Sequence, residues 1–131
     1  MKKKIYLNIF LLFFLTISIQ LNAKDIPNLV GKWQGDNIKS SLKKGFVKSN
    51  NVVEITEQRN RLFKGYVIHK GGKEAFVGVI RSDHRNFYWA DSSNDDGKVI
   101  GTILRKNKIE TCYLDSGRDA IAGCSVLKRE K

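Results

Sequence analysis

Apolar and polar residues alternate along most of the chain, and after the N-terminal segment no stretch shows the 3.6-residue apolar period of an amphipathic helix. Turn-forming residues recur about every ten positions, which is typical of an all-β sandwich or barrel. The pattern predicts eight strands, at about residues 29–34, 51–57, 61–69, 74–82, 86–91, 97–105, 108–115 and 120–128. The lysine- and serine-rich stretch 36–50 lacks this alternation and is expected to form a loop, a short helix or an irregular strand.

Several predicted strands carry a glycine near the centre, as in LFKGYV (62–67), AFVGVI (75–80) and VIGTIL (99–104). Glycine weakens a strand but lets it bend and coil sharply, which a small closed barrel requires. Cross-strand aromatic rings often cover such glycines. A turn at 83–84 predicts Trp89 opposite Gly78, and a three-residue loop at 106–108, with Asn107 in the left-handed conformation, predicts Tyr113 opposite Gly101.

The clearest hairpin turn is Lys70-Gly71-Gly72-Lys73, because Gly-Gly supplies the positive φ angles of a two-residue loop. This turn would pair Gly65 with Gly78. Two facing glycines leave a layer of the interior that these strands do not fill, so a cavity is expected there if the barrel has one. The alternative is an interior filled by the aromatic side chains.

Short connections favour an antiparallel meander. One face of the predicted sheet carries the glycines and most large apolar residues, and it is expected to be the interior. Its members are Trp33, Val53, Ile55, Phe63, Val67, Phe76, Ile80, Phe87, Trp89, Val99, Ile103, Tyr113 and Leu127. The predicted fold is therefore an all-β, eight-stranded antiparallel up-and-down barrel, with a sandwich as the alternative.

The N-terminus has the composition of a secretory signal peptide. Three lysines precede an apolar run from Ile5 to Ile19, and Leu21-Asn22-Ala23 resembles a cleavage site. We expect residues 1–23 to be removed and residues 24–131 to form a single barrel domain, located in the periplasm or secreted. A transmembrane anchor is the alternative, but the run is short for a span of roughly 20 apolar residues.

Charge and cysteine content fit an exported protein. The chain of 131 residues has a formal charge of +11, and loss of the three N-terminal lysines leaves +8, which favours anionic surfaces such as phospholipid or lipopolysaccharide. The two cysteines, Cys112 and Cys124, are expected to form one disulfide that staples the last hairpin and pairs Tyr113 with Gly123.

The segment Asn28-Leu29-Val30-Gly31-Lys32-Trp33 places a Gly-x-Trp motif on the first strand of an eight-stranded barrel. In this it resembles the calycin superfamily, which includes lipocalins, fatty-acid-binding proteins and avidins. The resemblance implies that Trp33 lies at the base of the barrel and that a basic residue of the last strand packs on it. Arg129 fits this role by its parity, with Lys128 as the alternative. Biotin binding is not implied, because Gln34–Ser40 does not reproduce the polar loop of avidins.

No constellation of residues indicates catalysis, so we expect the protein not to be an enzyme. Asp83-His84-Arg85 is the nearest approach to a catalytic cluster but is better explained as an exposed hairpin turn. The run from Asp91 to Gly97 superficially resembles a calcium loop, yet it lacks the glutamate twelve positions in and the flanking helices. We expect no metal, no cofactor and no nucleic-acid partner.

The leading functional hypothesis is a non-catalytic exported barrel that binds a small apolar or amphipathic ligand in its mouth. The inner aromatic residues predicted to contact this ligand are Trp33, Phe63, Phe76, Phe87 and Trp89. The alternative is a protein- or envelope-binding module, similar to inhibitors, that acts through the basic surface of the 36–50 segment. Its candidate residues are Lys39, Lys43, Lys44 and Lys48.

Overall fold

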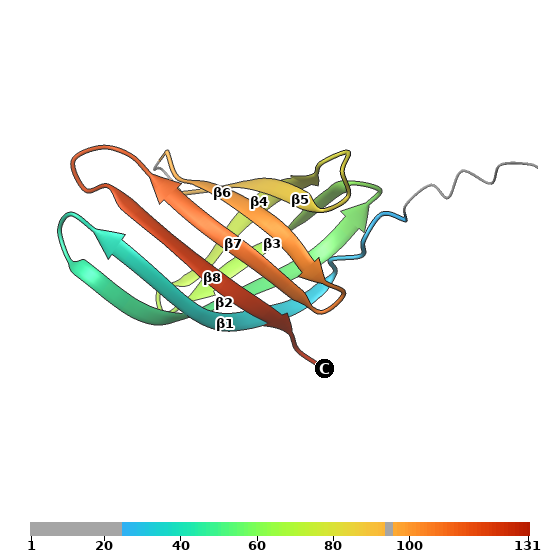
Figure 1. Cartoon of the computed structure of the whole chain (residues 1–131), viewed down its shortest axis with the longest axis horizontal. Helices are drawn as coiled ribbons and strands as arrows, with labels where there is room; N and C mark the ends of the chain where they lie inside the picture. Colours follow the sequence, from blue (N-terminus) through green and yellow to red (C-terminus); the bar gives the residue numbers. More distant parts are fainter. Residues whose placement is uncertain (1–24, 94–95) are drawn as a thin grey trace, which may run out of the picture.

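Eight antiparallel strands follow one another around a closed β-barrel, in which the last strand pairs with the first (Figure 1). The computed structural model describes residues 25–93 and 96–131, so the predicted signal peptide lies outside the described residues. The strands are β1 (Gly31–Ser41), β2 (Gly45–Arg59), β3 (Leu62–His69), β4 (Gly72–Ile80), β5 (Asn86–Asp91), β6 (Lys98–Arg105), β7 (Lys108–Asp115) and β8 (Ile121–Arg129). The predicted up-and-down barrel is confirmed, and the sandwich alternative is excluded. Within the described ranges, no helix is long and apolar enough to cross a membrane.

The two ends of the barrel differ. At the closed end, residues 25–30 lie before β1, next to the turns at 60–61, 81–85 and 106–107. The side chain of Gln58 holds this segment in place, because its Oε1 accepts a hydrogen bond from Leu29 N at 2.8 Å and its Nε2 donates to Pro27 O at 2.8 Å. At the open end lie the turns at 42–44, 70–71 and 116–120 and the β5–β6 connection.

The segment 36–50 is a regular β-hairpin, which corrects the prediction that the first two strands end at 34 and begin at 51. Pairing between β1 and β2 is continuous from Gly31 opposite Ile55 to Ser41 opposite Gly45. The hairpin extends the wall of the barrel at the open end (Figure 1). Most of its side chains are polar on both faces, so no apolar alternation marks these residues as strand, and backbone pairing determines their conformation.

The interior near the closed end is a packed apolar core. All thirteen residues predicted to face inward are buried or pack against the buried cluster, and Leu29 and Ile109 join them. The aromatic rings are in direct contact: Trp89 stacks on Phe76 with ring centroids 4.5 Å apart and on Phe87 at 5.8 Å, and Phe63 meets both phenylalanines edge-on.

The predicted register between β3 and β4 is wrong by two residues. His69 pairs with Gly72 around a Lys70-Gly71 turn, so Gly65 lies opposite Phe76 and Gly78 lies opposite Phe63. A shift of two residues keeps every side chain on the same face, and the hydrophobic pattern therefore cannot detect it. No layer of facing glycines exists in these two strands, and the cavity expected there is absent from this pair.

Aromatic rings do cover inner glycines, but with other partners than predicted. Gly78 faces Trp89 as expected, yet the ring that occupies the position of its missing side chain belongs to Phe63. Gly101 faces Thr111 rather than Tyr113, because the β6–β7 turn is shorter than predicted and the register shifts between residues 103 and 105. The ring of Phe87 lies over Gly101.

The expected contact between Trp33 and Arg129 is present at the closed end. The Arg129 guanidinium carbon lies 4.3 Å from the centre of the Trp33 ring, and Trp33 Nε1 donates to Leu29 O at 2.9 Å. The same guanidinium donates hydrogen bonds to the carbonyl oxygens of Val30, Asn28 (2.6 Å) and Lys106 (3.3 Å). Arg129 thus ties the start of β1 to the last strand, and its partial burial lowers its pKa.

Gly65→Ala should destabilise the barrel by about 3 kcal/mol, because a Cβ on residue 65 would lie 2.0 Å from the carbonyl oxygen of Glu54 and would force β2 and β3 apart. Urea unfolding measures the effect. The control is Gly71→Ala in the exposed turn, where the nearest atoms are 3.3 Å away and belong to the mobile end of His69; it should change stability by less than about 0.5 kcal/mol. Equal effects of the two substitutions would contradict the close approach at Gly65.

Arg129→Met should cost about 2 kcal/mol, because it removes the cation–π contact with Trp33 and three charge-assisted hydrogen bonds. Lys128→Met, one residue away and exposed, should leave the unfolding midpoint within about 0.5 kcal/mol of the parent. A tolerated Arg129→Met would mean that apolar packing and the hydrogen bonds of Gln58 and Trp33 hold the closed end without Arg129.

Candidate functional site

A cavity of about 240 Å³ opens at the open end of the barrel, above the aromatic core. Side chains from all eight strands and from the start of the β5–β6 connection form its wall. The lining residues are Asn37, Lys39, Asn51, Val67, Glu74, Trp89, Asp91, Ser93, Val99, Thr111, Tyr113, Ile121, Gly123 and Ser125. Half of the barrel interior is therefore solid, and the other half is a hollow with many polar groups.

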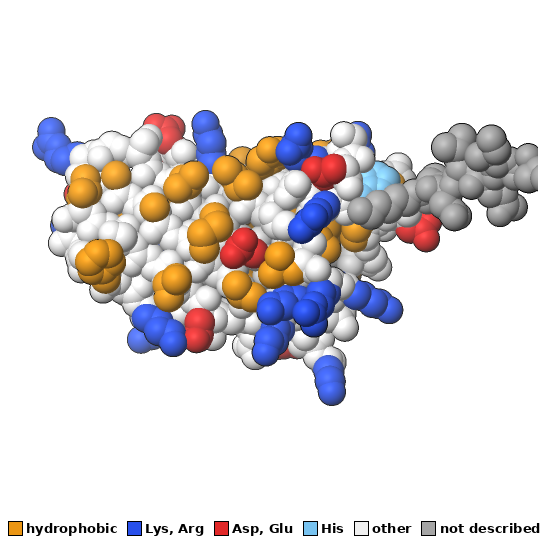
Figure 2. Space-filling model, viewed as in Figure 1, with side chains coloured by type: hydrophobic (Ala, Val, Ile, Leu, Met, Phe, Trp, Pro, Cys, Tyr) orange, Lys and Arg blue, Asp and Glu red, His pale blue; other side chains and the backbone are white. Residues whose placement is uncertain are grey.

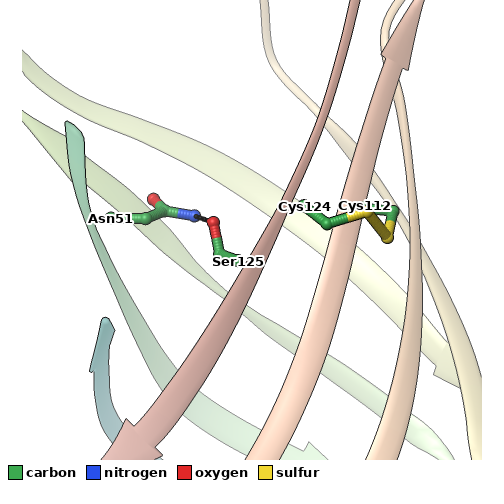
Figure 3. The surroundings of a disulfide bond; sticks show 4 residues. All are labelled: Asn51, Cys112, Cys124 and Ser125. Carbon is green, nitrogen blue, oxygen red and sulfur yellow. Dashed lines mark hydrogen bonds between the residues drawn. A yellow bond between two sulfur atoms is a disulfide. The ribbon is translucent and has the colours of Figure 1, made fainter. Parts of the chain in front are cut away.

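The deepest lining residues combine an apolar floor with hydroxyl groups. Trp89, Val99, Thr111 and Ser125 are all buried. Asn51 Nδ2 donates to Ser125 Oγ at 3.3 Å across the interior (Figure 3). Among the described residues, none accepts a hydrogen bond from the buried indole Nε1 of Trp89. A buried N–H without an acceptor is costly, so this group is a candidate donor to a bound molecule.

Charged side chains line the cavity nearer the rim. Lys39 approaches from β1, Glu74 from β4 and Asp91 from the end of β5, and all three are half-buried. Glu74 Oε1 lies 3.3 Å from His69 Nε2, and Asp91 Oδ1 accepts a hydrogen bond from Ser93 N at 3.2 Å. The rim thus presents both signs of charge. Among the described residues, no three His, Cys, Asp or Glu side chains are grouped as a metal site requires.

The structure separates the five aromatic residues predicted to contact a ligand. Trp89 lies on the wall of the cavity, whereas Trp33, Phe63, Phe76 and Phe87 belong to the buried core and do not line the cavity. The polar lining residues were not identified from the sequence, although their parity marks them: Asn37 and Lys39 follow Trp33 at even spacing, and Asp91 follows Trp89. Polar residues at inward strand positions are therefore the sequence signal for this cavity, and in 36–50 that signal is hidden because no apolar alternation marks the strand.

The four lysines of the alternative surface site do not form one group. Lys39 lines the cavity, and Lys48 Nζ pairs with Asp36 Oδ2 at 3.0 Å on the hairpin. Lys43 and Lys44 lie in the turn between β1 and β2. The apolar side chains of Leu42 and Phe46 beside them are 76% and 93% exposed. The tip of this hairpin is therefore both basic and apolar.

Cys112 and Cys124 form the predicted disulfide between directly paired positions of β7 and β8. Tyr113 pairs with Gly123, as expected. The disulfide and the Asn51–Ser125 hydrogen bond lie on opposite sides of β8, because Ser125 points inward and its neighbour Cys124 points outward (Figure 3). The disulfide therefore stabilises the barrel wall beside the cavity and does not enter the cavity. A disulfide is compatible with an oxidising exported compartment.

Comparison with known proteins supports the architecture alone. No protein-family model matches the chain, and no curated protein does. Among solved structures, the chain is similar to a redesigned β-barrel, with a TM-score of 0.51 and 14% sequence identity over 79% of this chain and 92% of the other. At this identity the similarity shows that the chain is a β-barrel and carries no information about its ligand.

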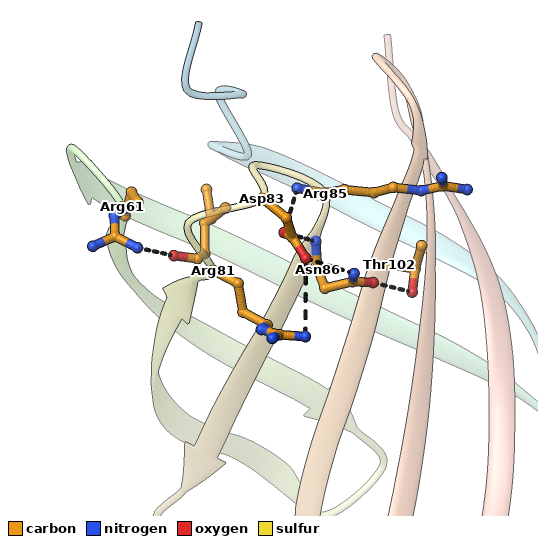
Figure 4. A network of polar contacts seen from close by, with 7 residues as sticks. Arg61, Arg81, Asp83, Arg85, Asn86 and Thr102 are labelled. Atoms are coloured by element: carbon orange, nitrogen blue, oxygen red, sulfur yellow. Dashed lines mark hydrogen bonds and ion pairs between the residues drawn. The ribbon is translucent and has the colours of Figure 1, made fainter. Parts of the chain in front are cut away.

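The Asp83-His84-Arg85 segment forms the exposed β4–β5 turn (Figure 4). The Asp83 carboxylate accepts hydrogen bonds from the backbone N–H groups of Asn86 and Arg85, both at 2.9 Å, and from Asn86 Nδ2 at 2.8 Å. These bonds hold the pKa of Asp83 well below its usual range, with the Arg81 charge as a lesser cause. A general base that works near neutral pH needs the opposite shift, so the geometry fits a carboxylate that orders the turn.

The Asp83 turn makes the free energy of unfolding depend on pH. Because the folded pKa of Asp83 is lower than its unfolded value of about 3.9, its contribution is complete above about pH 4 and is lost as the pH falls through the folded pKa. The excess stability of the parent over Asp83→Asn, measured by urea unfolding at several pH values, should be constant near neutrality and decrease in acid. A difference that does not change down to about pH 2 would contradict a hydrogen-bonded, ionised Asp83.

Proposed function

We propose that this protein is an exported, non-catalytic β-barrel that binds a small amphipathic molecule in the cavity at its open end. The observation that carries the proposal is the cavity itself, with the buried and unpartnered indole N–H of Trp89 in its wall among the described residues. A concave site with a largely apolar floor and a few polar groups is the usual form of a small-molecule site.

The lining favours an amphipathic ligand over a purely apolar one. Trp89, Val99 and Val67 offer apolar contact, whereas Lys39, Glu74 and Asp91 would be desolvated by any molecule that fills the mouth. An apolar occupant would displace water from those charges without replacing the hydrogen bonds that water makes to them, which is unfavourable. A molecule with an apolar part toward Trp89 and polar groups toward the rim satisfies both regions.

The size of the cavity limits the ligand. Its volume of about 240 Å³ lies just below the roughly 300–1,000 Å³ of typical ligand pockets. A compact molecule fits this space, whereas a long acyl chain would have to extend past the rim. The aromatic core below leaves no room for deeper insertion, because Trp89 stacks directly on Phe76 and Phe87.

The proposal of export rests on the sequence of residues 1–23 and is supported by the disulfide. We also propose that the barrel is calycin-like. The cation–π contact of Arg129 with Trp33 at the closed end supports this, since it is the arrangement that the Gly31-Lys32-Trp33 motif implies.

A second candidate is binding to a protein or an envelope component through the β1–β2 hairpin. The exposed Leu42 and Phe46 beside Lys43 and Lys44 favour it, because exposed apolar side chains with basic neighbours suit an anionic, partly apolar partner. Within the hairpin, the tip is the part that combines exposed apolar and basic side chains, since Lys39 lines the cavity and Lys48 pairs with Asp36.

Native mass spectrometry of the protein recovered from its cells without denaturation tests the cavity. We expect an adduct of small mass that disappears on denaturation. Thr111→Leu adds bulk to the buried wall and should lose the adduct, whereas the matched control Thr56→Leu on the exposed face of β2 should keep it. Trp89→Phe, which removes the indole N–H, should weaken retention even if Thr111→Leu folds poorly. Equal retention by all three variants, or a parent that takes up nothing from an extract of its own envelope, would refute the proposal.

A further inference from the structure

Five basic side chains at the closed end lie together without acidic partners. They are Arg85 in the β4–β5 turn, Arg105 at the end of β6, Lys106 in the next turn, Lys108 at the start of β7 and Lys128 near the end of β8; we call them the basic cluster. Arg105 is paired with Lys108, and Lys108 is paired with Lys128, so three cations stand directly opposite one another across three strands.

Such an arrangement is unfavourable in the isolated protein. Like charges at directly opposed strand positions repel each other and destabilise the sheet. Within the described residues, no carboxylate oxygen lies within 4.0 Å of a charged nitrogen of the basic cluster. This includes the carboxylate of Glu110, which lies on β7 two residues from Lys108. Arg85 lies two residues from Asp83, but its guanidinium points away from that carboxylate (Figure 4).

Several basic residues elsewhere on the barrel do have acidic partners. Lys32 pairs with Glu130 at 3.2 Å, Lys64 with Glu57 at 2.6 Å and Lys73 with Glu54 at 3.4 Å. What distinguishes the basic cluster is that its uncompensated cations include residues at directly opposed strand positions. Figure 2 shows lysine and arginine side chains gathered toward the end of the molecule where the chain leaves the barrel.

The course of the chain indicates what this end faces. Residue 25 lies at the closed end, and the apolar run Ile5–Ile19 ends only six residues earlier in the sequence. Six residues span at most about 20 Å. While that run is in a bilayer, before cleavage or as an anchor, the closed end is held within this distance of the lipid headgroups.

We propose that the basic cluster is a docking site for an anionic phospholipid bilayer, with the closed end toward the membrane and the mouth of the cavity away from it. Five cations on a rigid barrel end complement a layer of phosphate groups, and bilayer phosphates would relieve the repulsion among Arg105, Lys108 and Lys128. This site is separate from the cavity, and neither depends on the other.

The test is binding to vesicles made of equal parts phosphatidylglycerol and phosphatidylcholine, compared with vesicles of phosphatidylcholine alone. The protein is recovered from the exporting cell, and its N-terminus is determined by mass. Because a retained apolar segment would bind both vesicles, the readout is the ratio of the two partition coefficients. For the parent this ratio should be large in low salt and fall steeply as salt is added.

The decisive variant carries Lys106→Gln, Lys108→Gln and Lys128→Gln. Its matched control carries Lys70→Gln, Lys98→Gln and Arg118→Gln, three exposed positions at the open end, with the same change in net charge. The first should lower the ratio about 100-fold and the second less than about threefold, since each cation near an anionic surface contributes roughly a factor of five.

The melting temperature in low salt separates loss of binding from loss of the fold. Removing the opposed charges at positions 108 and 128 should raise the melting temperature by about 1–4 °C, whereas damage to the barrel would lower it. An equal loss of binding in both triple variants would mean that net charge alone attracts the protein, and a loss confined to the open-end variant would place docking at the open end. Binding of a single-stranded oligonucleotide as tightly as of anionic vesicles, with the same sensitivity to the cluster, would assign the cluster to nucleic acid. Each of these three results would overturn the proposal.

Discussion

The pairing of β8 with β1 is the constraint on which the remaining structure depends. Closing eight short strands requires each of them to coil, and the chain meets this requirement with glycines on the inner face. Gly35 and Gly65 permit neighbouring backbone to approach to distances that a Cβ would prevent, whereas Gly78 and Gly101 make room for the rings of Phe63 and Phe87. The residues that allow curvature thus also create the space that the aromatic core fills.

This use of the interior divides the barrel into two functional halves. Toward the closed end, the aromatic rings, Leu29 and the Trp33–Arg129 contact leave a solid core. Toward the open end, the strands continue but their inward residues become polar, and a hollow remains. Trp89 lies at the boundary, stacked on two phenylalanines and exposed along part of its edge to the cavity. A filled core below a polar hollow holds the lining residues in fixed positions, which would lower the entropic cost of the proposed binding.

The outer surface is divided in a similar way by charge. Isolated exposed ion pairs such as Lys48–Asp36 contribute little to stability, because water screens them and ordering the side chains costs entropy. They do, however, neutralise their part of the surface. The cross-strand row of Arg105, Lys108 and Lys128 has no such compensation, whereas side chains of both charges lie around the mouth of the cavity. The two proposed activities are thereby placed at opposite ends of the same rigid body.

The alternation of apolar and polar residues by itself determined which large apolar side chains face inward. The short connections indicated a meander of strands, and the two cysteines indicated one disulfide in the last hairpin. The resemblance through Gly31-Lys32-Trp33 implied a basic residue of the last strand on Trp33, and parity favoured Arg129 over Lys128 for that role. Only the tertiary structure decided the register of β3 against β4 and of β6 against β7, because a shift of two residues leaves every side chain on its face and thus leaves no trace in the pattern.

The hairpin at 36–50, the polar cavity and the basic cluster depend on tertiary structure for a related reason. Polar residues on both faces of a strand carry no apolar period, so backbone pairing with a neighbour determines their conformation and inward direction. Arg105, Lys108 and Lys128 are spread over more than twenty positions of the sequence and look dispersed along it. Barrel closure places them side by side, because cross-strand pairing joins residues that the chain itself keeps apart.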